Sequence, residues 1–238
     1  MVPKVKVCRR SATATARTNA HPAVLLVMSH VVILPTLNEG AYLSRTLASL
    51  EIQTCRSETL VVDSHSTDKT REVAEKFDCK VIDAPRGKLN ARHLGILKAE
   101  ADIIVSCDAD TIYPPRWLEN TIAAFKDDSV VGVTGPRLYS NVWVNDAQRA
   151  FYEYCWRFFG SNSAFLRKAY FMSGGFNLSI DQQDSKKMVD EEEVLFKERL
   201  QAFGKVVYQP DNPIITSARR FGSSDKDFKD QVKAKQRF

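Results

Sequence analysis

Two carboxylates stand one residue apart in this chain, at Asp108 and Asp110, directly after the apolar run of residues 103–105. The apolar run predicts a buried strand, and side chains two positions apart in a strand point to the same side. Two neighbouring carboxylates repel each other unless a positive group lies between them. We therefore expect this pair to hold a divalent cation.

Polar side chains also follow two earlier predicted strands. The strand at residues 31–35 leads into the polar segment 36–39, and the strand at residues 59–63 leads into the polar run 63–68. In a parallel sheet, ligands bind beyond the carboxyl ends of the strands. Each segment alone also fits a turn, a capping loop or a chance pair of acids, but three of them at one edge predict a binding site.

The elements that would position these residues follow from the alternation of apolar and polar segments. Strands are expected at residues 31–35, 59–63, 80–84 and 102–108, and helices at residues 38–50, 66–77 and 89–99. Ser66 or Thr67 is the expected N-terminal cap of the second helix. Strict rotation of strand and helix predicts an α/β fold, in which a mostly parallel central sheet is covered by helices on both faces.

Length and composition indicate one large folded domain with short extensions. The 238 residues are 44% hydrophobic and 26% charged, which suits a substantial core. Residues 1–30 contain no acid and show no strand or helix periodicity, so a transit segment, a disordered tail and a translation start at Met28 all stay open. We expect the folded domain at residues 31–221 and a basic tail or helix at residues 222–238.

The charge and cysteine patterns exclude several kinds of protein. Residues 31–238 keep 29 of the 34 basic side chains and all 29 acidic ones, and this neutral body argues against a nucleic-acid partner. The five scattered cysteines form no CxxC pair, which argues against a disulfide framework or a thiolate zinc site. The apolar runs are too short for a membrane span. We expect a cytoplasmic protein, with peripheral membrane contact through the basic tail as a second setting.

Four segments resemble, in this order, the family-2 glycosyltransferases: VVILPTLNEGAYLSRTLASL, LVVDSHSTDKT, RGKLNARHLGILKA and DIIVSCDADTIYPPRWL. The likeness continues in GSNSAFLRKAYFMSGGFN and DEEEVLFKERLQAFGKVVYQPD. The resemblance implies an inverting enzyme of the GT-A fold, made of one domain. Residues 31–135 would bind a nucleotide-diphosphate sugar, and residues 136–221 would form the acceptor and catalytic half.

The resemblance assigns the donor site to residues at the strand ends. The nucleoside would contact Pro35, Thr36, Glu39 and Asp63, and the diphosphate side of the donor would lie near Lys88, Asp108, Ala109 and Asp110. Asp110, with Asp108 assisting, would bind Mg²⁺ or Mn²⁺ against the diphosphate, since both ions prefer oxygen ligands. A surface role for Lys88 at a helix start stays open.

The resemblance also implies a catalytic base, which removes a proton from the acceptor hydroxyl. The matching acidic run, residues 190–193, precedes Arg199-Leu200 and Gly204, and counting back from these residues places Glu193 in the base position. The usual aspartate of the family is a glutamate here, and the run of four acids leaves Glu192 and Glu191 as substitutes. Acids also favour a helix N-terminus without any catalytic role.

Two later segments carry weaker signals. Gly174, Gly175 and Phe176 would let a backbone approach a saccharide or lipid-linked acceptor, although a tight turn needs the same glycines. Arg219 and Arg220 would donate to a diphosphate, or else form a surface pair. The aromatic residues 143–159 favour a core helix over a groove at a membrane surface.

Two other functions stay open. A phosphatase of the haloacid-dehalogenase type also carries a DxD motif, but at its first strand and with Thr or Val two residues further on, where this chain has Ile112. A protein that binds a nucleotide sugar without catalysis is the second alternative. The order of the motifs favours an enzyme that transfers a sugar.

Overall fold

The computed structural model describes residues 28–139, 160–183, 186–217 and 219. Residues 1–27 of the predicted extension 1–30, the predicted tail 222–238 and the aromatic segment at 143–159 lie outside the described residues. His30, at the end of the predicted extension, is instead the first residue of a strand.

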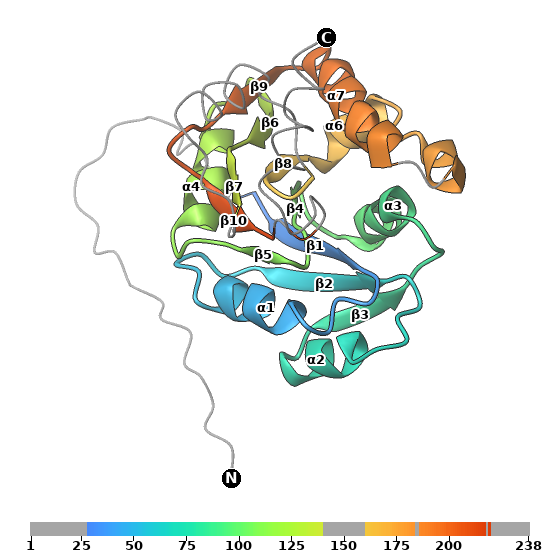
Figure 1. Cartoon of the computed structure of the whole chain (residues 1–238). Coiled ribbons are helices and arrows are strands. Elements are labelled where there is room, and N and C mark those ends of the chain that lie inside the picture. The colour runs from blue at the N-terminus through green and yellow to red at the C-terminus, as the bar shows by residue number, and fades with distance from the viewer. Residues whose placement is uncertain (1–27, 140–159, 184–185, 218, 220–238) are drawn as a thin grey trace, which may run out of the picture.

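A seven-stranded sheet forms the centre of the molecule (Figure 1), in the order β3-β2-β1-β4-β8-β6-β9. The strand pairs are parallel except for those of β8, which runs antiparallel to β4 and β6. The mostly parallel sheet predicted from the sequence is therefore confirmed. Its strands are β1 (His30–Thr36), β2 (Glu58–Asp63), β3 (Lys80–Asp83), β4 (Ile103–Ser106), β6 (Val130–Thr134), β8 (Ser163–Leu166) and β9 (Lys205–Tyr208).

Helices cover both faces of this sheet. They are α1 (Leu43–Glu51), α2 (Thr70–Lys76), α3 (Lys88–Lys98), α4 (Trp117–Ala123), α6 (Arg167–Met172) and α7 (Lys186–Gln201), with the 3-10 helices η1 (Ala124–Lys126) and η2 (Leu178–Gln183). In Figure 1, α1 and α2 lie on one side of β1, β2 and β3, and α3 lies on the other.

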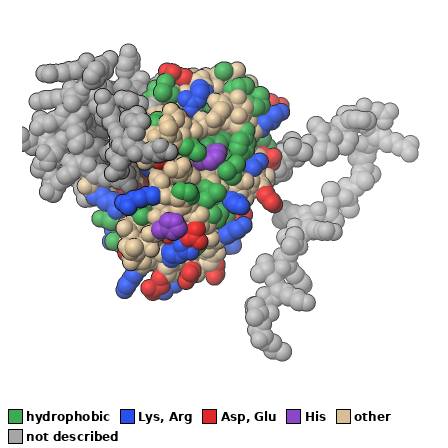
Figure 2. Space-filling model, turned by 90° about the vertical axis from the view of Figure 1, so that its right-hand side faces the viewer, with side chains coloured by type: hydrophobic (Ala, Val, Ile, Leu, Met, Phe, Trp, Pro, Cys, Tyr) green, Lys and Arg blue, Asp and Glu red, His purple; other side chains and the backbone are tan. Residues whose placement is uncertain are grey.

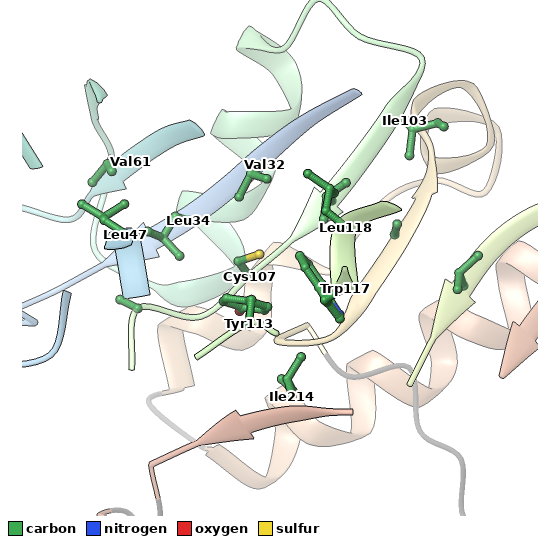
Figure 3. Packing of buried hydrophobic residues seen from close by; sticks show 14 of the residues in the cluster. Val32, Leu34, Leu47, Val61, Ile103, Cys107, Tyr113, Trp117, Leu118 and Ile214 are labelled. Carbon is green, nitrogen blue, oxygen red and sulfur yellow. The ribbon is translucent and has the colours of Figure 1, made fainter. Parts of the chain in front are cut away.

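The core is divided into two apolar clusters because neighbouring residues of a strand point to opposite faces. Val32 and Leu34 of β1 pack with Leu47 of α1 and Trp117 of α4 in one cluster, part of which Figure 3 shows. Val31 and Ile33 belong to the other cluster, together with apolar residues of α3, α6 and α7. Two-sided burial explains why the first and fourth strands are nearly continuous apolar runs.

A second, three-stranded sheet has the order β5-β10-β7, formed by β5 (Thr111–Ile112), β10 (Ile214–Thr216) and β7 (Arg137–Tyr139). The strand β10 pairs antiparallel with β5 and parallel with β7. Because β5 directly follows the acidic pair, this sheet brings the residues after β10 beside Asp110.

The start of the second helix differs from the prediction. The helix α2 begins at Thr70, so Ser66 and Thr67 are not its caps. The Ser66 hydroxyl instead donates to Asp63 Oδ1 at 2.5 Å, while Asp68 Oδ1 accepts the Thr70 backbone N–H at 2.9 Å. The Ser66 hydroxyl donates to the Asp63 carboxylate instead of capping the helix, because hydrogen bonds to a charged acceptor are stronger than those to a neutral one.

Candidate functional site

The acidic pair lies in a turn rather than in a strand. The strand β4 ends at Ser106, and Asp108 and Asp110 follow it before β5. Tyr113, which is fully buried, holds this turn, because its hydroxyl accepts the Asp108 backbone N–H at 2.9 Å and donates to Ser161 O at 3.0 Å. Burial raises the pKa of Tyr113 well above its ordinary value, so it stays a neutral donor. The expected side-by-side arrangement of a strand is therefore wrong, and the two carboxylates meet different cations.

Asp108 is held by two cations of α3. Its Oδ2 lies 2.9 Å from Lys88 Nζ, and its Oδ1 lies 2.6 Å from Arg92 Nη2. Lys88 and Arg92 are four residues apart and therefore lie on the same side of the helix. Lys88 was expected near the diphosphate of a donor, and that role stays a prediction, although its ion pair with Asp108 places it at the acidic turn. Arg92 was missed; its spacing from Lys88 was the signal that would have found it.

Arg92 joins the acidic turn to α7. Its side chain is 1% exposed, and its Nη1 lies 3.3 Å from Glu193 Oε1. Gly160 leaves room for it, since a Cβ there would come within 2.2 Å of the guanidinium carbon. The Arg92 Nε is buried and has no hydrogen-bond partner in the described part of the chain. Asp108, Arg92 and Glu193 thus form one continuous row of charges from β4 to α7.

The two acids of α7 have different surroundings. Glu193 is 6% exposed, and its Oε1 accepts both the Arg92 donor and the Gly160 backbone N–H at 3.0 Å. Glu192 is 1% exposed, and its Oε1 accepts from the Asn177 backbone N–H at 2.8 Å and from Arg199 Nη2 at 2.5 Å. Glu193 therefore faces the acidic turn, whereas Glu192 ties α7 to the segment after the two glycines. The Glu191 side chain lies outside the described part of the chain.

Asp110 is held by Arg219, which follows β10. Arg219 Nη2 lies 3.1 Å from Asp110 Oδ2 and 2.6 Å from each carboxylate oxygen of Glu39. The Arg219 guanidinium also stacks over the Tyr42 ring, 4.2 Å from its centroid. Burial opposes the charge, but the hydrogen bond and charge of Glu39, with the charge of Asp110, hold the pKa of Arg219 above its ordinary value. A charged guanidinium therefore lies beside Asp110 in this structure. Arg220 lies outside the described residues.

The expected nucleoside residues lie together at the ends of β1 and β2. Thr36 Oγ1 donates to Asp63 Oδ1 at 2.9 Å, and Asp63 also accepts the Ser66 backbone N–H at 3.0 Å and lies 3.4 Å from Arg71 Nη1. Asp63 is 0% exposed. Asp63 accepts from four donors: the hydroxyls of Thr36 and Ser66, the Ser66 backbone N–H and the Arg71 guanidinium. One of these donors would have to move before the carboxylate could contact a nucleoside. Pro35 is buried beside it, and its role and that of Asp63 stay predictions.

Four further predicted residues, Ala109, Gly174, Gly175 and Phe176, make contacts that hold turns and packing in place. The Ala109 backbone oxygen accepts from Thr46 Oγ1 at 2.8 Å, which fixes the acidic turn to α1. Gly175 has φ +66° and sits against the Tyr170 ring, where a Cβ would come within 2.9 Å, and Gly174 has φ +84°. Phe176 packs against the rings of Tyr170 and Phe196. The turn explains both glycines, so their acceptor role stays a prediction.

The acidic pair fits a divalent cation only together with oxygen ligands from a substrate. Among the residues that the structure describes, no group of three or more His, Cys, Asp or Glu side chains could hold a metal ion. Mg²⁺ usually takes one or two carboxylates and completes its shell with water and substrate phosphates. Asp108 and Asp110 supply two carboxylates of this kind, and basic side chains beside them suit a phosphate.

The described surface carries charges of both signs. Figure 2 shows basic and acidic side chains interspersed on one face, with apolar side chains gathered near its middle. The exposed large apolar residues include Leu97, Phe171 and Met172. No helix among the described residues is long and apolar enough to cross a membrane.

Comparison of the sequence with known proteins gives a consistent picture. Residues 31–181 match the family model described as glycosyl transferase family 2. The chain is 31% identical over 110 residues to uncharacterized glycosyltransferase alr2836 of Nostoc sp., over 43% of this chain and 34% of that protein. It is 40% identical over 107 residues to uncharacterized glycosyltransferase Rv0539 of Mycobacterium tuberculosis, over 44% of this chain and 47% of that protein. The chain thus spans less than half of each relative.

Solved structures share the fold. The mannosyltransferase PcManGT of Pyrobaculum calidifontis, in complex with GDP-Man and Mn²⁺, superposes with a TM-score of 0.65 at 20% identity, over 87% of this chain and 62% of that one. The TarS fragment of S. aureus superposes with a TM-score of 0.66 at 20% identity, over 85% of this chain and 63% of that one. These likenesses confirm the predicted GT-A architecture.

Proposed function

We propose, because this chain belongs to glycosyl transferase family 2, that it transfers a sugar from a nucleotide-diphosphate sugar to an acceptor hydroxyl with inversion. The observation that carries this proposal is the row of charges from Asp108 through Arg92 to Glu193. It puts a carboxylate of α7 next to the acidic turn, where a donor's diphosphate would lie. The relatives named above are glycosyltransferases, and neither a phosphatase nor a binding protein finds support among them.

The donor is a nucleoside diphosphate sugar in this proposal. PcManGT was crystallised with GDP-Man and TarS with UDP-GlcNAc, so the shared fold accepts donors of this class. In this chain, Thr36 and Asp63 would face the nucleoside, and Lys88 would face the diphosphate. The acceptor is a saccharide or a lipid-linked sugar.

Glu193 acts as the base. Both hydrogen bonds that Glu193 makes with described residues use Oε1, so Oε2 is the atom that takes the proton of the acceptor hydroxyl. The acceptor oxygen then bonds to the anomeric carbon while the bond between that carbon and the diphosphate breaks, and the bonding electrons leave with the nucleoside diphosphate. Attack from the side opposite the leaving group inverts the sugar.

The cations of the site stabilise the charges of this reaction. Arg92 keeps Glu193 in place through Nη1 while its Nη2 holds Asp108. Lys88 and Arg219 lie beside the acidic turn, where basic groups would meet the oxygens of the diphosphate. When bound by Asp108 and Asp110, Mg²⁺ or Mn²⁺ supplies positive charge that stabilises the departing diphosphate.

The test is the variant Glu193→Gln, which keeps the shape of the side chain but removes the base. We expect turnover of nucleotide sugars with Mn²⁺, followed as release of nucleoside diphosphate, to fall about 10²- to 10⁴-fold. Binding of the nucleoside diphosphate, measured by calorimetry, should stay unchanged. The matched control is Glu198→Gln, since Glu198 is an exposed residue of the same helix. Full turnover by Glu193→Gln would show that Glu193 is not the catalytic base, and Glu192→Gln would then be tested.

A further inference from the structure

Arg219 occupies the side of Asp110 that faces the rim of the sheet. Its Nη2 contacts Asp110 Oδ2 at 3.1 Å and both oxygens of Glu39 at 2.6 Å, and the ring of Tyr42 lies against its plane. These partners come from the segment after β1 and from the turn after β4. A residue near the end of the chain thus joins two of the strand ends that form the candidate site.

The described charged residues of the site nearly cancel one another without any ligand. The described carboxylates are Glu39, Asp108, Asp110 and Glu193, and the described cations that contact them are Lys88, Arg92 and Arg219. Four acids against three cations leave a single negative charge. A divalent cation arriving alone would make the cluster positive, whereas removal of Arg219 would leave two negative charges, which a divalent cation neutralises.

The donors of Arg219 are only partly used. All of its contacts with carboxylates run through Nη2, and its Nη1 and Nε have no hydrogen-bond partner among the described residues. The side chain is 26% exposed. A guanidinium presents its donors in a planar fork that matches the oxygens of a phosphate. Arg219 can therefore hold Asp110 in one state and bind a diphosphate in another.

We propose that Arg219 is an internal cation that competes with the metal ion for Asp110, and that the diphosphate of the nucleotide releases Asp110 by drawing Arg219 to itself. This inference rests on the function proposed above, since it assumes that the acidic turn binds a metal ion together with a nucleotide. Its consequence is that the metal ion binds weakly alone and much more tightly with the nucleoside diphosphate. In this proposal the metal ion is bound mainly when the nucleotide is present, so the binding of each ligand strengthens the binding of the other.

The test measures Mn²⁺ binding directly, from the electron paramagnetic resonance signal of free Mn²⁺. It is done with the full chain, without nucleotide and with saturating UDP or GDP. For Arg219→Gln, we expect the affinity for Mn²⁺ alone to rise on the order of tenfold, because the competing cation is gone. The factor by which the nucleotide strengthens Mn²⁺ binding should fall by a similar amount. An unchanged or lower affinity for Mn²⁺ alone would overturn the proposal.

A second variant weakens the position of Arg219 beside Asp110 without changing the charge of the site. Tyr42→Leu removes the ring beneath the guanidinium but changes no charge, so we expect Mn²⁺ alone to bind more tightly, by less than in Arg219→Gln. Arg116→Gln is the matched control, because Arg116 is exposed and its one ion pair with a described residue is with Glu119 at the surface. Its Mn²⁺ binding should equal that of the unmodified chain. If Tyr42→Leu lowers the affinity for Mn²⁺, the competition is contradicted even when Arg219→Gln fails to fold.

The variant Asp110→Asn distinguishes the two proposals. If it retains full Mn²⁺ binding, the acidic turn is not the metal site, and the function proposed above loses its metal assignment. If it loses Mn²⁺ binding while Arg219→Gln behaves like the unmodified chain, only the competition by Arg219 is wrong.

Discussion

Arg92 carries its positive charge in a position where 1% of its side chain is exposed. Burying a guanidinium is unfavourable unless carboxylates and hydrogen bonds compensate for lost water. Asp108 and Glu193 provide this compensation from opposite sides, at 2.6 and 3.3 Å. The same three charges then place the candidate base beside the acidic turn, so stability and function depend on one side chain.

The variant Arg92→Met tests this dependence. Methionine fills much of the volume but leaves two largely buried carboxylates with fewer partners, so we expect the free energy of unfolding to fall by about 3 kcal/mol. Urea unfolding measures the change. Arg45→Met is the control, since Arg45 is exposed on α1. Unchanged stability of Arg92→Met would mean that the buried charges contribute nothing to the fold.

At the scale of elements, α3 supplies both of the described cations that hold Asp108. Its N-cap residue is Gly87, whose φ of +127° favours glycine. Glycine has no side chain that could cap the helix. Asp181 of η2 instead accepts the Asn90 backbone N–H at 2.6 Å, and a Cβ on Gly87 would come within 2.3 Å of the same carboxylate oxygen. A cap from a distant segment thus holds the helix turn that carries Lys88 and Arg92.

The contact between α3 and α6 makes stability depend on pH. Tyr170 Oη accepts the Phe176 backbone N–H and lies within hydrogen-bond distance of His93 Nδ1, at 2.8 Å. Burial lowers the pKa of His93 below its ordinary value of 6.5, so the folded chain prefers the neutral ring. The unfolded chain then binds a proton more readily, and the stability from the neutral ring is present above about pH 6.5 and lost as the pH falls.

The variant His93→Gln should therefore reduce the pH dependence of unfolding. We expect the unmodified chain to lose more stability than His93→Gln between pH 7.5 and pH 5.5, by less than about 1 kcal/mol because the ring is only partly buried. Thermal unfolding at the two pH values measures this. His65→Gln, at an exposed position, should behave like the unmodified chain. An equal loss in His93→Gln would show that other groups cause the acid sensitivity.

At the scale of the whole molecule, Asn162 links the two sheets to α4. Its Oδ1 accepts from Trp117 Nε1 at 2.7 Å, and its Nδ2 donates to the backbone oxygens of Pro136 and Asn212 at 3.0 and 3.2 Å. The side chain is buried, so every one of these partners would lose its hydrogen bond without it. Because β10 and Arg219 follow Asn212, this residue also supports the position of Arg219.

The variant Asn162→Leu tests this link. The buried Trp117 Nε1–H and the buried Asn212 backbone oxygen each lose a partner, at a cost of about 1–3 kcal/mol apiece. The partly buried Pro136 oxygen keeps the Ile214 backbone N–H, so we expect the free energy of unfolding to fall by about 2 kcal/mol or more. Asn90→Leu is the control, since the Arg86 backbone oxygen is the one described acceptor of the Asn90 side chain. Urea unfolding compares the two. A loss below about 1 kcal/mol in Asn162→Leu would mean that water or a shifted neighbour replaces its hydrogen bonds.

Much of the fold was predictable from local patterns. The first four strands and the third helix lie close to the predicted ranges, although the fourth strand ends at Ser106 instead of residue 108. The first two helices begin later than predicted, at Leu43 instead of residue 38 and at Thr70 instead of residue 66. The prediction that Ser66 or Thr67 caps α2 was wrong, because polar side chains after a strand form hydrogen bonds with one another as readily as with the backbone N–H groups of a helix start. The reversed direction of β8 had no signal in the sequence, since apolar content does not encode strand direction.

The sequence by itself determined the α/β architecture, the order of the motifs and the position of the acidic turn, because these depend on residues near one another in the chain. Only the tertiary structure decided that Arg92 meets Glu193, 101 residues away, and that Arg219 meets Glu39, 180 residues away. Such contacts depend on how each helix is rotated against the sheet and where the second sheet docks. The packing of both apolar clusters sets this geometry, and no short segment contains it.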